Sequence, residues 1–260
     1  MDSSSNNVLL ELKDATIRFG GLVAVNSVNF HINKGDLFGL IGPNGAGKTT
    51  CFNMVTGVYK PTSGQINFGG KSIAGLPPHI IAKRGIARTF QNIRLFSALS
   101  VLENVMIGGF LRNKTTLGSS LAYLPGAIHD TERIRLRAME LLEVMDLADF
   151  AKVRSCDLPY GKQRRLEIAR AMATDPELLL LDEPAAGMNP QESEDLLMAV
   201  RRIRDEFNKT VLLIEHDMKF VMNLCERIFV LDHGEEIAQG GPADIRNNPK
   251  VIEAYLGEAV

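Results

Sequence analysis

Hydrophobic residues are spaced as in strands near both ends of the chain and as in helices through its middle. Apolar and β-branched runs predict strands, and apolar residues that recur every three or four positions predict helices. The predicted strands span residues 8–19, 28–32, 37–41, 64–68, 85–90, 178–181, 211–214 and 228–231. The predicted helices span residues 48–56, 101–106, 132–145, 163–173, 191–207 and 218–224, and Gly57 fits the C-cap of the first.

Strands that alternate with helices after residue 175 indicate an α/β fold, with parallel strands joined by crossover helices. The helical middle interrupts this core. We therefore expect a core of about residues 8–95 and 175–257, with a helical part at about 96–174. Turn-forming residues at 112–126 predict a loop-containing insertion within the helical part.

The bulk composition narrows the class of protein. A chain of 260 residues with 45% hydrophobic and 23% charged residues is typical of an ordinary globular protein. Twenty-nine basic against 31 acidic residues leave a formal charge of −2, which gives no electrostatic reason to expect nucleic acid as a partner. The polar start predicts no secretory signal, and no apolar run approaches the ~18–20 residues of a membrane span. Any membrane role is therefore expected to be peripheral.

The cysteines Cys51, Cys156 and Cys225 are few and far apart, which suggests neither a zinc site nor disulfides and fits a reducing cytosol. Cys51 falls in the first turns of the helix predicted at residues 48–56.

A glycine-rich turn joins the predicted strand at 37–41 to the helix that follows. Its sequence, GPNGAGKT, matches the phosphate-loop pattern G-x-x-x-x-G-K-[ST]. Glycines let backbone N–H groups wrap phosphates, and the helix directs its positive dipole end at them. Lys48 is expected to reach the β- and γ-phosphates, and Thr49 to ligate Mg²⁺. The residues predicted to contact the nucleotide here are Gly42, Pro43, Asn44, Gly45, Ala46, Gly47, Lys48, Thr49 and Thr50.

Two carboxylates, Asp182 and Glu183, follow the apolar strand predicted at 178–181. Ligands of parallel sheets bind outside the carboxyl ends of the strands. Asp182 is expected to hold Mg²⁺ through water, and Glu183 to orient or deprotonate the attacking water. The alternative is a solvated loop start before Pro184. Together with the phosphate loop, the pair favours hydrolysis of ATP. Because Cys51 lies in the first turns of the phosphate-loop helix, we expect bound ATP to slow its alkylation.

Four further segments make the chain resemble the ATP-binding cassette (ABC) ATPases. Gln91, in RTFQNIRLF, occupies the position of that family's Q-loop glutamine, and LPYGKQ at 158–163 occupies that of its signature. Residues 184–189 match the D-loop, and His216, in LLIEHD, matches the switch histidine. The resemblance implies a single ABC ATPase domain at residues 8–257. It implies a P-loop NTPase (RecA-like) core, an antiparallel β subdomain and an inserted helical subdomain.

The resemblance also implies roles for individual residues. Lys48, Glu183 and His216 would act in catalysis, and Thr49, Gln91 and Asp182 would hold the metal ion. Phe19 stands where the family stacks an aromatic ring on adenine. Without the family, Phe19 is more often a core residue, His216 a structural histidine, and Gln91 an ordinary polar residue after a strand.

In this family, the signature of one subunit completes the ATP site of another in a head-to-tail dimer. The residues that would face the partner's ATP are Pro159, Tyr160, Gly161, Lys162 and Asn189. Pro159 replaces the usual serine and Asn189 the usual aspartate, so hydrogen bonds to the partner are expected to weaken at both positions. The charge of Lys162, which replaces a glutamine, is hypothesised to compensate by approaching the triphosphate.

Several stretches look very similar to the ATP-binding subunits of branched-chain amino-acid importers. Among them are RFGGLVAVNSV at 18–28, DEPAAGMNP at 182–190 and NNPKVIEAYLGE at 247–258. This implies two membrane permease subunits, a second ABC ATPase, an indirectly coupled substrate-binding protein, and a peripheral location on the cytoplasmic face of the cell membrane. Two alternatives stay open: an exporter ATPase of the lipopolysaccharide-export type, and a soluble ABC protein without a permease.

Overall fold

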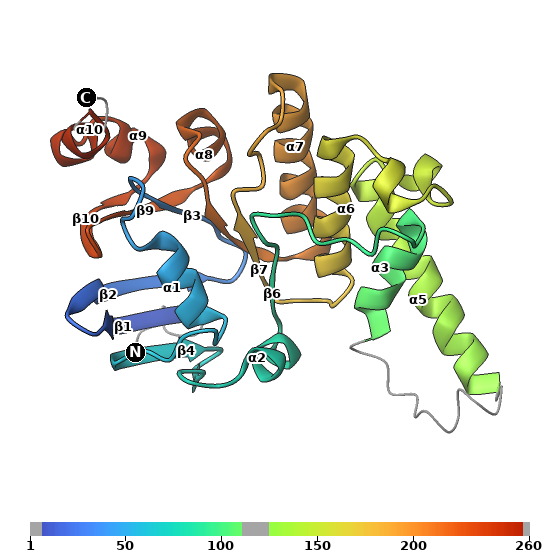
Figure 1. Cartoon of the computed structure of the whole chain (residues 1–260), viewed down its shortest axis with the longest axis horizontal. Coiled ribbons are helices and arrows are strands. Elements are labelled where there is room, and N and C mark those ends of the chain that lie inside the picture. The colour runs from blue at the N-terminus through green and yellow to red at the C-terminus, as the bar shows by residue number, and fades with distance from the viewer. Residues whose placement is uncertain (1–6, 111–124, 257–260) are drawn as a thin grey trace.

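The computed structural model describes residues 7–110 and 125–256, which build two sheets and the helices around them (Figure 1). The strands are β1 (Val8–Phe19), β2 (Leu22–Asn33), β3 (Leu37–Ile41), β4 (Ser63–Phe68), β5 (Lys71–Ser72), β6 (Ile86–Arg88), β7 (Leu178–Asp182), β8 (Thr210–Ile214), β9 (Arg227–Asp232) and β10 (Glu235–Gly240). The helices are α1 (Lys48–Val55), α2 (Pro78–Arg84), α3 (Val101–Gly109), α5 (Pro125–Val144), α6 (Tyr160–Met172), α7 (Pro190–Phe207), α8 (Met218–Leu224), α9 (Pro242–Arg246) and α10 (Pro249–Leu256). Short 3₁₀ turns lie at Ala148–Phe150 and Ser155–Asp157.

The larger sheet has six strands in the order β10-β9-β3-β8-β7-β6. Its five strands from β9 to β6 are parallel, and β10 pairs antiparallel with β9. The chain leaves β3 for α1 and returns to the sheet through crossovers, as the alternating pattern predicts. The parallel arrangement brings the ends of β3, β7 and β8 to the same edge, where the phosphate loop and the acidic pair begin.

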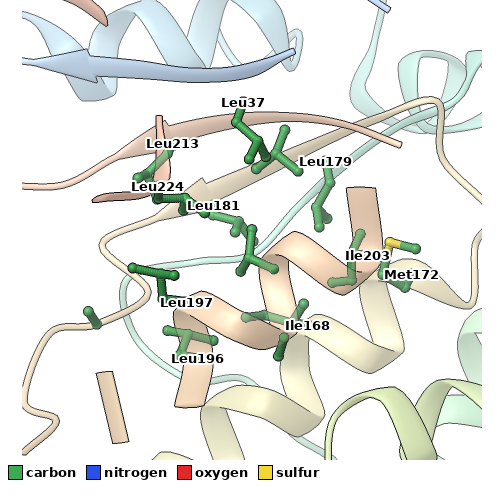
Figure 2. Packing of buried hydrophobic residues seen from close by; sticks show 14 of the residues in the cluster. Leu37, Ile168, Met172, Leu179, Leu181, Leu196, Leu197, Ile203, Leu213 and Leu224 are labelled. Atoms are coloured by element: carbon green, nitrogen blue, oxygen red, sulfur yellow. The ribbon is translucent and has the colours of Figure 1, made fainter. Parts of the chain in front are cut away.

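Both faces of this sheet are covered, which explains the unbroken leucines of β7. Leu179 and Leu181 point toward helices α6, α7 and α8, where they pack with Ile168, Leu196 and other apolar residues (Figure 2). The alternate residues of the strand, Leu178 and Leu180, pack on the opposite face with α1 and the smaller sheet. The side-chain period of two therefore splits one strand between two buried clusters.

The smaller sheet is antiparallel, with the order β2-β1-β4-β5. It lies at the opposite end of the molecule from α3 and α5 (Figure 1). Helix α1 packs between the two sheets, because Phe52 and Val55 are buried in the same cluster as Leu10 of β1 and Phe38 of β3. The phosphate-loop helix is thereby fixed by both sheets, and the antiparallel β subdomain expected from the family is present.

Helices α3, α5 and α6 pack together between β6 and β7 in the chain and form the helical insertion. Helix α3 begins at a capping box, in which Ser100 and Glu103 bond each other's main-chain N–H groups. Gly108 lets α3 approach α6, since a Cβ there would lie 2.4 Å from the carbonyl oxygen of Arg170. The predicted insertion at 112–126 falls mostly outside the described residues; its last residues, from Pro125, begin α5.

Some predicted boundaries are wrong. Strand β2 starts at Leu22 rather than at residue 28, and α6 starts at Tyr160 rather than at residue 163. Proline at 159 and glycine at 161 hid this helix start, because both lower helix propensity away from the first turn. Helices α2, α9 and α10 and strands β5 and β10 were not predicted. They are short or polar, so their patterns carry little periodic signal.

Candidate functional site

The phosphate loop forms a cradle at the C-terminal end of β3. Gly42, Gly45 and Gly47 have φ angles of 146°, 78° and 101°, which only glycine adopts without strain. A Cβ on Gly42 would lie 1.9 Å from the carbonyl oxygen of Leu231. The Lys48 ammonium donates to the carbonyl oxygens of Gly42 and Pro43, at 2.6 and 2.7 Å. The loop is thus wrapped around its own lysine, with the N-terminus of α1 behind it.

A pocket of about 450 Å³ opens over this cradle. The predicted nucleotide-binding residues that line it are Phe19, Asn44, Gly45, Ala46, Gly47, Lys48, Thr49 and Thr50, and the predicted catalytic residue Glu183 lines it as well. Phe19 is 44% exposed and meets Tyr59 edge to face, so its ring is a surface platform rather than part of the core. His233, for which the sequence indicated no role, also lines the pocket. It stands in the β9–β10 turn, where Gly234 N–H donates to the Ala46 carbonyl.

Asp182 ends the buried strand β7 and has a partner that the sequence did not reveal. Arg88, at the end of the neighbouring strand β6, donates to Asp182 Oδ2 at 2.7 Å, and both side chains are buried. The same guanidinium donates to Asn53 Oδ1 on α1 at 2.7 Å. Arg88 therefore fixes the Asp182 carboxylate against the phosphate-loop helix.

Glu183 lies next to two other predicted site residues, Gln91 and His216. Gln91 Nε2 donates to Glu183 Oε2 at 2.8 Å, and His216 Nδ1 lies 3.9 Å from Glu183 Oε1. Glu183 has a φ of 47°, and its N–H donates to the carbonyl of Ile214 at the end of β8. The strained conformation turns the Glu183 side chain from the strand end toward the pocket.

Glu215 is a second carboxylate in this region, and the sequence did not single it out. It is buried, and its oxygens accept from the N–H groups of Ala185, His216 and Asp217. Burial raises the pKa of Glu215. Its contacts join the loop after Glu183 to the His216 segment. The sequence signal was an acid directly after the apolar run LLI.

The signature residues lie outside this pocket. Pro159 is the N-cap of α6, Tyr160 is exposed, and the Lys162 ammonium lies 4.2 Å from the Phe150 ring centroid. Gly161 faces the start of α7, since a Cβ there would lie 2.7 Å from Glu192 Oε1. Within one chain these residues do not line the pocket that Lys48 and Thr49 line.

Asn189 has a local function in this chain. Its side chain accepts from the Glu192 N–H at 2.9 Å, and Glu192 Oε2 accepts from the Asn189 N–H at 3.0 Å. This capping box starts α7. Asparagine is as good an N-cap as the family's aspartate, so the replacement keeps the helix start intact.

Two features are absent from the described residues, 7–110 and 125–256. None of their helices is long and apolar enough to cross a membrane. No three histidine, cysteine, aspartate or glutamate side chains gather there as a metal site.

Comparison with known proteins agrees with these features. The family model described as ABC transporter matches residues 25–186, and a second model, Branched-chain amino acid ATP-binding cassette transporter, matches residues 235–260. A curated relative is the high-affinity branched-chain amino acid transport ATP-binding protein BraF of Pseudomonas aeruginosa. It is 49% identical over 252 residues, which cover 96% of this chain and 98% of BraF.

Solved structures agree as well. The crystal structure of the ADP conformation of MJ1267, an ATP-binding cassette of an ABC transporter, has a TM-score of 0.84 and 32% identity and covers 96% of this chain and 99% of its own. MJ0796, a cassette described as dimeric in a post-hydrolysis state with ADP and Pi, has a TM-score of 0.74 and 27% identity, over 90% of this chain and 99% of its own. The chain belongs to the ABC transporter family, among the ATP-binding proteins of the branched-chain amino-acid transport type.

Proposed function

We propose that this chain is the ATP-hydrolysing subunit that energises an importer of branched-chain amino acids. The observation that carries the enzymatic part is the position of Glu183. It lines the same pocket as the phosphate loop and accepts a hydrogen bond from Gln91. The amino-acid class is supported by the 49% identity to BraF and by the match at residues 235–260.

Nucleotide binding would begin at the cradle. The adenine ring stacks on Phe19, and the phosphates lie against the N–H groups of residues 44–49. Lys48 turns from the carbonyls of Gly42 and Pro43 to the β- and γ-phosphates. Mg²⁺, held by Thr49, Gln91 and, through water, Asp182, would offset the negative charge of the phosphates. Arg88 keeps Asp182 in place for this task.

Hydrolysis would use Glu183 as the general base. Its carboxylate takes the proton of a water while the oxygen of that water attacks the γ-phosphorus, and the bond to the leaving ADP oxygen breaks. Gln91 holds Glu183 Oε2, which leaves Oε1 for the water. His216, next to Glu183 Oε1, would orient the transferred group with its imidazole N–H. Positioning by these groups matters more than covalent chemistry in such reactions.

The active form is proposed to be a head-to-tail pair of ATPase subunits. Pro159, Tyr160, Gly161, Lys162 and Asn189 lie away from their own chain's pocket, which supports contact with the nucleotide of a second ABC ATPase. The dimeric structure of MJ0796 with ADP and Pi supports the same arrangement. The expected division into a core and a helical subdomain at residues 96–174 would let the signature close over that nucleotide.

Two membrane permease subunits are the proposed partners of the assembly. A groove of about 670 Å³ lies between α2, β6, α3 and α6. Its surface carries the exposed rings of Phe90 and Phe96, with Arg94 and Arg170 over them. Such a mixed apolar and cationic groove suits a helical segment of a permease. The chain would then lie peripherally on the cytoplasmic face of the membrane, and a substrate-binding protein would act indirectly through the permease.

The function is tested with a Glu183→Gln variant. Loss of the general base should lower kcat by about 10²–10⁴-fold, while ATP still binds and traps a dimer. ATP hydrolysis and sedimentation with ATP measure the two effects. A variant that keeps most of its turnover would remove Glu183 from the role of base.

The transport assignment is tested by pull-down from detergent-solubilised membranes. Recovery of two permease subunits and a second ABC ATPase, with ATPase activity stimulated by a branched-chain amino acid and its binding protein, is the expected result. A complex without membrane proteins would contradict the transport role. Stimulation by a different substrate class would contradict the amino-acid assignment alone.

A further inference from the structure

Arg164 is the largest fully buried side chain of the described residues, with 0% of its residue surface exposed. It lies one turn after Tyr160, at the start of α6, and so belongs to the helix that carries the signature. A buried guanidinium is unfavourable unless its charge and its donors are matched. The hydrogen-bond partners of Arg164 therefore indicate its structural role.

The guanidinium of Arg164 binds the main chain of the Gln91 segment. Its Nη1 donates to the Phe90 carbonyl and its Nη2 to the Gln91 carbonyl, both at 2.6 Å. These are short, charge-assisted hydrogen bonds, and the planar fork of arginine spans two neighbouring carbonyls. The Gln91 segment belongs to no helix or strand, so contacts of this kind determine where it lies.

Glu167, one turn further along α6, completes the contact. Its Oε2 accepts from Arg164 Nη1 at 2.9 Å, and its Oε1 accepts from the Arg94 N–H at 3.3 Å. Arg164 and Glu167 thus hold both ends of residues 90–94 from one helix, Arg164 with its N–H donors and Glu167 with a carboxylate acceptor. We call these two side chains and their contacts with residues 90–94 the clamp. The same segment reaches the catalytic side, where Gln91 Nε2 donates to Glu183 Oε2.

We propose that Arg164 is a positioning residue that ties the main chain of Gln91 to the signature helix and thereby sets the contact between Gln91 and Glu183. The inference rests on the proposed function, because it assumes that Glu183 acts in hydrolysis. When α6 moves relative to the β6–β7 edge, the clamp carries Gln91 with it. The position of the signature that serves the partner's ATP is then linked to the hydrolytic group at the chain's own ATP.

The test compares Arg164→Lys with Arg165→Lys in the full-length chain. Lysine keeps the charge of Arg164 but cannot bridge two carbonyls with a planar fork. We expect kcat to fall about 10- to 100-fold, because a displacement of about 1 Å in a positioned group is enough for that loss. The KM for ATP should stay within about twofold, since the phosphate loop is untouched.

Arg165 is a matched control on the same helix. It is also largely buried and ion-paired, but its partner is Asp146 Oδ2 at 3.3 Å, within the helical insertion. Arg165→Lys should leave both kcat and KM within about twofold of wild type. An equal loss of kcat in the two variants would show a general effect of α6 and overturn the proposal.

A double-mutant cycle with Gln91→Ala separates positioning from structural damage. If Arg164 acts through Gln91, Arg164→Lys lowers kcat in the wild-type background and has little further effect once the Gln91 side chain is absent. A full additional loss in the Gln91→Ala background, or no loss in the wild-type background, would overturn the proposal.

Kinetics of a Glu167→Gln variant and amide hydrogen exchange of residues 90–94 provide two further tests. If Arg164→Lys folds poorly, Glu167→Gln weakens the same clamp at nearly constant volume, and an unchanged kcat there counts against it. Amide hydrogen exchange of residues 90–94 needs no hydrolysis and should rise in the Arg164 and Glu167 variants but not in Arg165→Lys. An inactive wild-type chain with this exchange pattern would contradict the proposed function and leave the clamp supported.

Discussion

At the scale of single residues, the site combines exposed side chains such as Phe19 and His216 with buried carboxylates, Asp182 and Glu215, that fix the surrounding segments. Asp182 is paired with Arg88, whereas the Glu215 oxygens accept from main-chain N–H groups, with His216 Nδ1 3.9 Å from Glu215 Oε2. Glu215 joins the segment after Glu183 to His216, so its protonation affects the geometry between them. A sequence pattern does not show the partners of these carboxylates, because the partners are brought together only when the chain folds.

The buried carboxyl of Glu215 should make stability depend on pH. Burial raises the pKa of Glu215 above its ordinary 4.5, so the folded state holds the proton more tightly than the unfolded state. Its stabilising contribution is therefore full below about pH 4.5 and is lost as the pH rises through the raised pKa. The Tm of wild type minus that of Glu215→Gln should fall as the pH rises from about 4.5 to about 7. Thermal unfolding across this range measures it, with Glu194→Gln on the exposed face of α7 as control. If the Tm of wild type minus that of Glu215→Gln increases with pH, the raised pKa of Glu215 is contradicted.

Thiol labelling should be confined to one cysteine. Cys51 is 1% exposed, and burial raises the pKa of its thiol to about 12, as it does for Cys225. Burial therefore limits alkylation of Cys51 in the native chain even without ATP, and the effect of ATP on the remaining slow labelling stays a prediction. In brief alkylation near neutral pH, mass spectrometry should find label only on Cys156, which is exposed. Rapid labelling of Cys51 in the native chain would show that α1 does not pack between the sheets.

At the scale of elements, Asn189 links the proposed dimer contact to the start of α7. Asn189→Ala removes the cap and should cost about 1 kcal/mol, which lowers Tm by about 2–4 °C in a protein of this size. Asn189→Asp keeps the cap and adds a favourable charge at the helix N-terminus, so its Tm should equal or exceed that of wild type. Thermal unfolding of the isolated chain measures both. A Tm that falls equally in the two variants would exclude the capping box as the cause.

The elements also show how far the sequence alone could go. The strands at 37–41 and 211–214 and the helices at 191–207 and 218–224 have strong apolar periods, and the structure has elements at all four. The phosphate loop and acidic pair could be located because each follows a buried strand. The roles of Arg88, Arg164, Glu215 and His233 could not be derived from the sequence. Arg88 contacts Asp182, Arg164 contacts residues 90–91 and Glu215 contacts Ala185, and no local pattern records contacts with such distant segments.

At the scale of the whole molecule, each ATP site is proposed to need two ATPase subunits. In the absence of the second ABC ATPase, two copies of this chain are expected to pair on ATP, so mixing two defective variants of this chain tests the proposal. Lys48→Ala loses phosphate contacts but keeps an intact signature. Gly161→Asp keeps the phosphate loop but disrupts the signature, because its side chain crowds Glu192 at the start of α7 and its carboxylate repels both Glu192 and the partner's phosphates. Neither variant alone should hydrolyse ATP.

In an equal mixture about half of the dimers are mixed, and each of these holds one intact composite site, so about a quarter of wild-type activity should return. ATPase activity after mixing measures this, and mixing Lys48→Ala with Lys48→Ala,Gly161→Asp is the control that should restore none. Mixed dimers that form but remain inactive would contradict a site shared between chains, and activity of Gly161→Asp on its own would show that a single chain is sufficient.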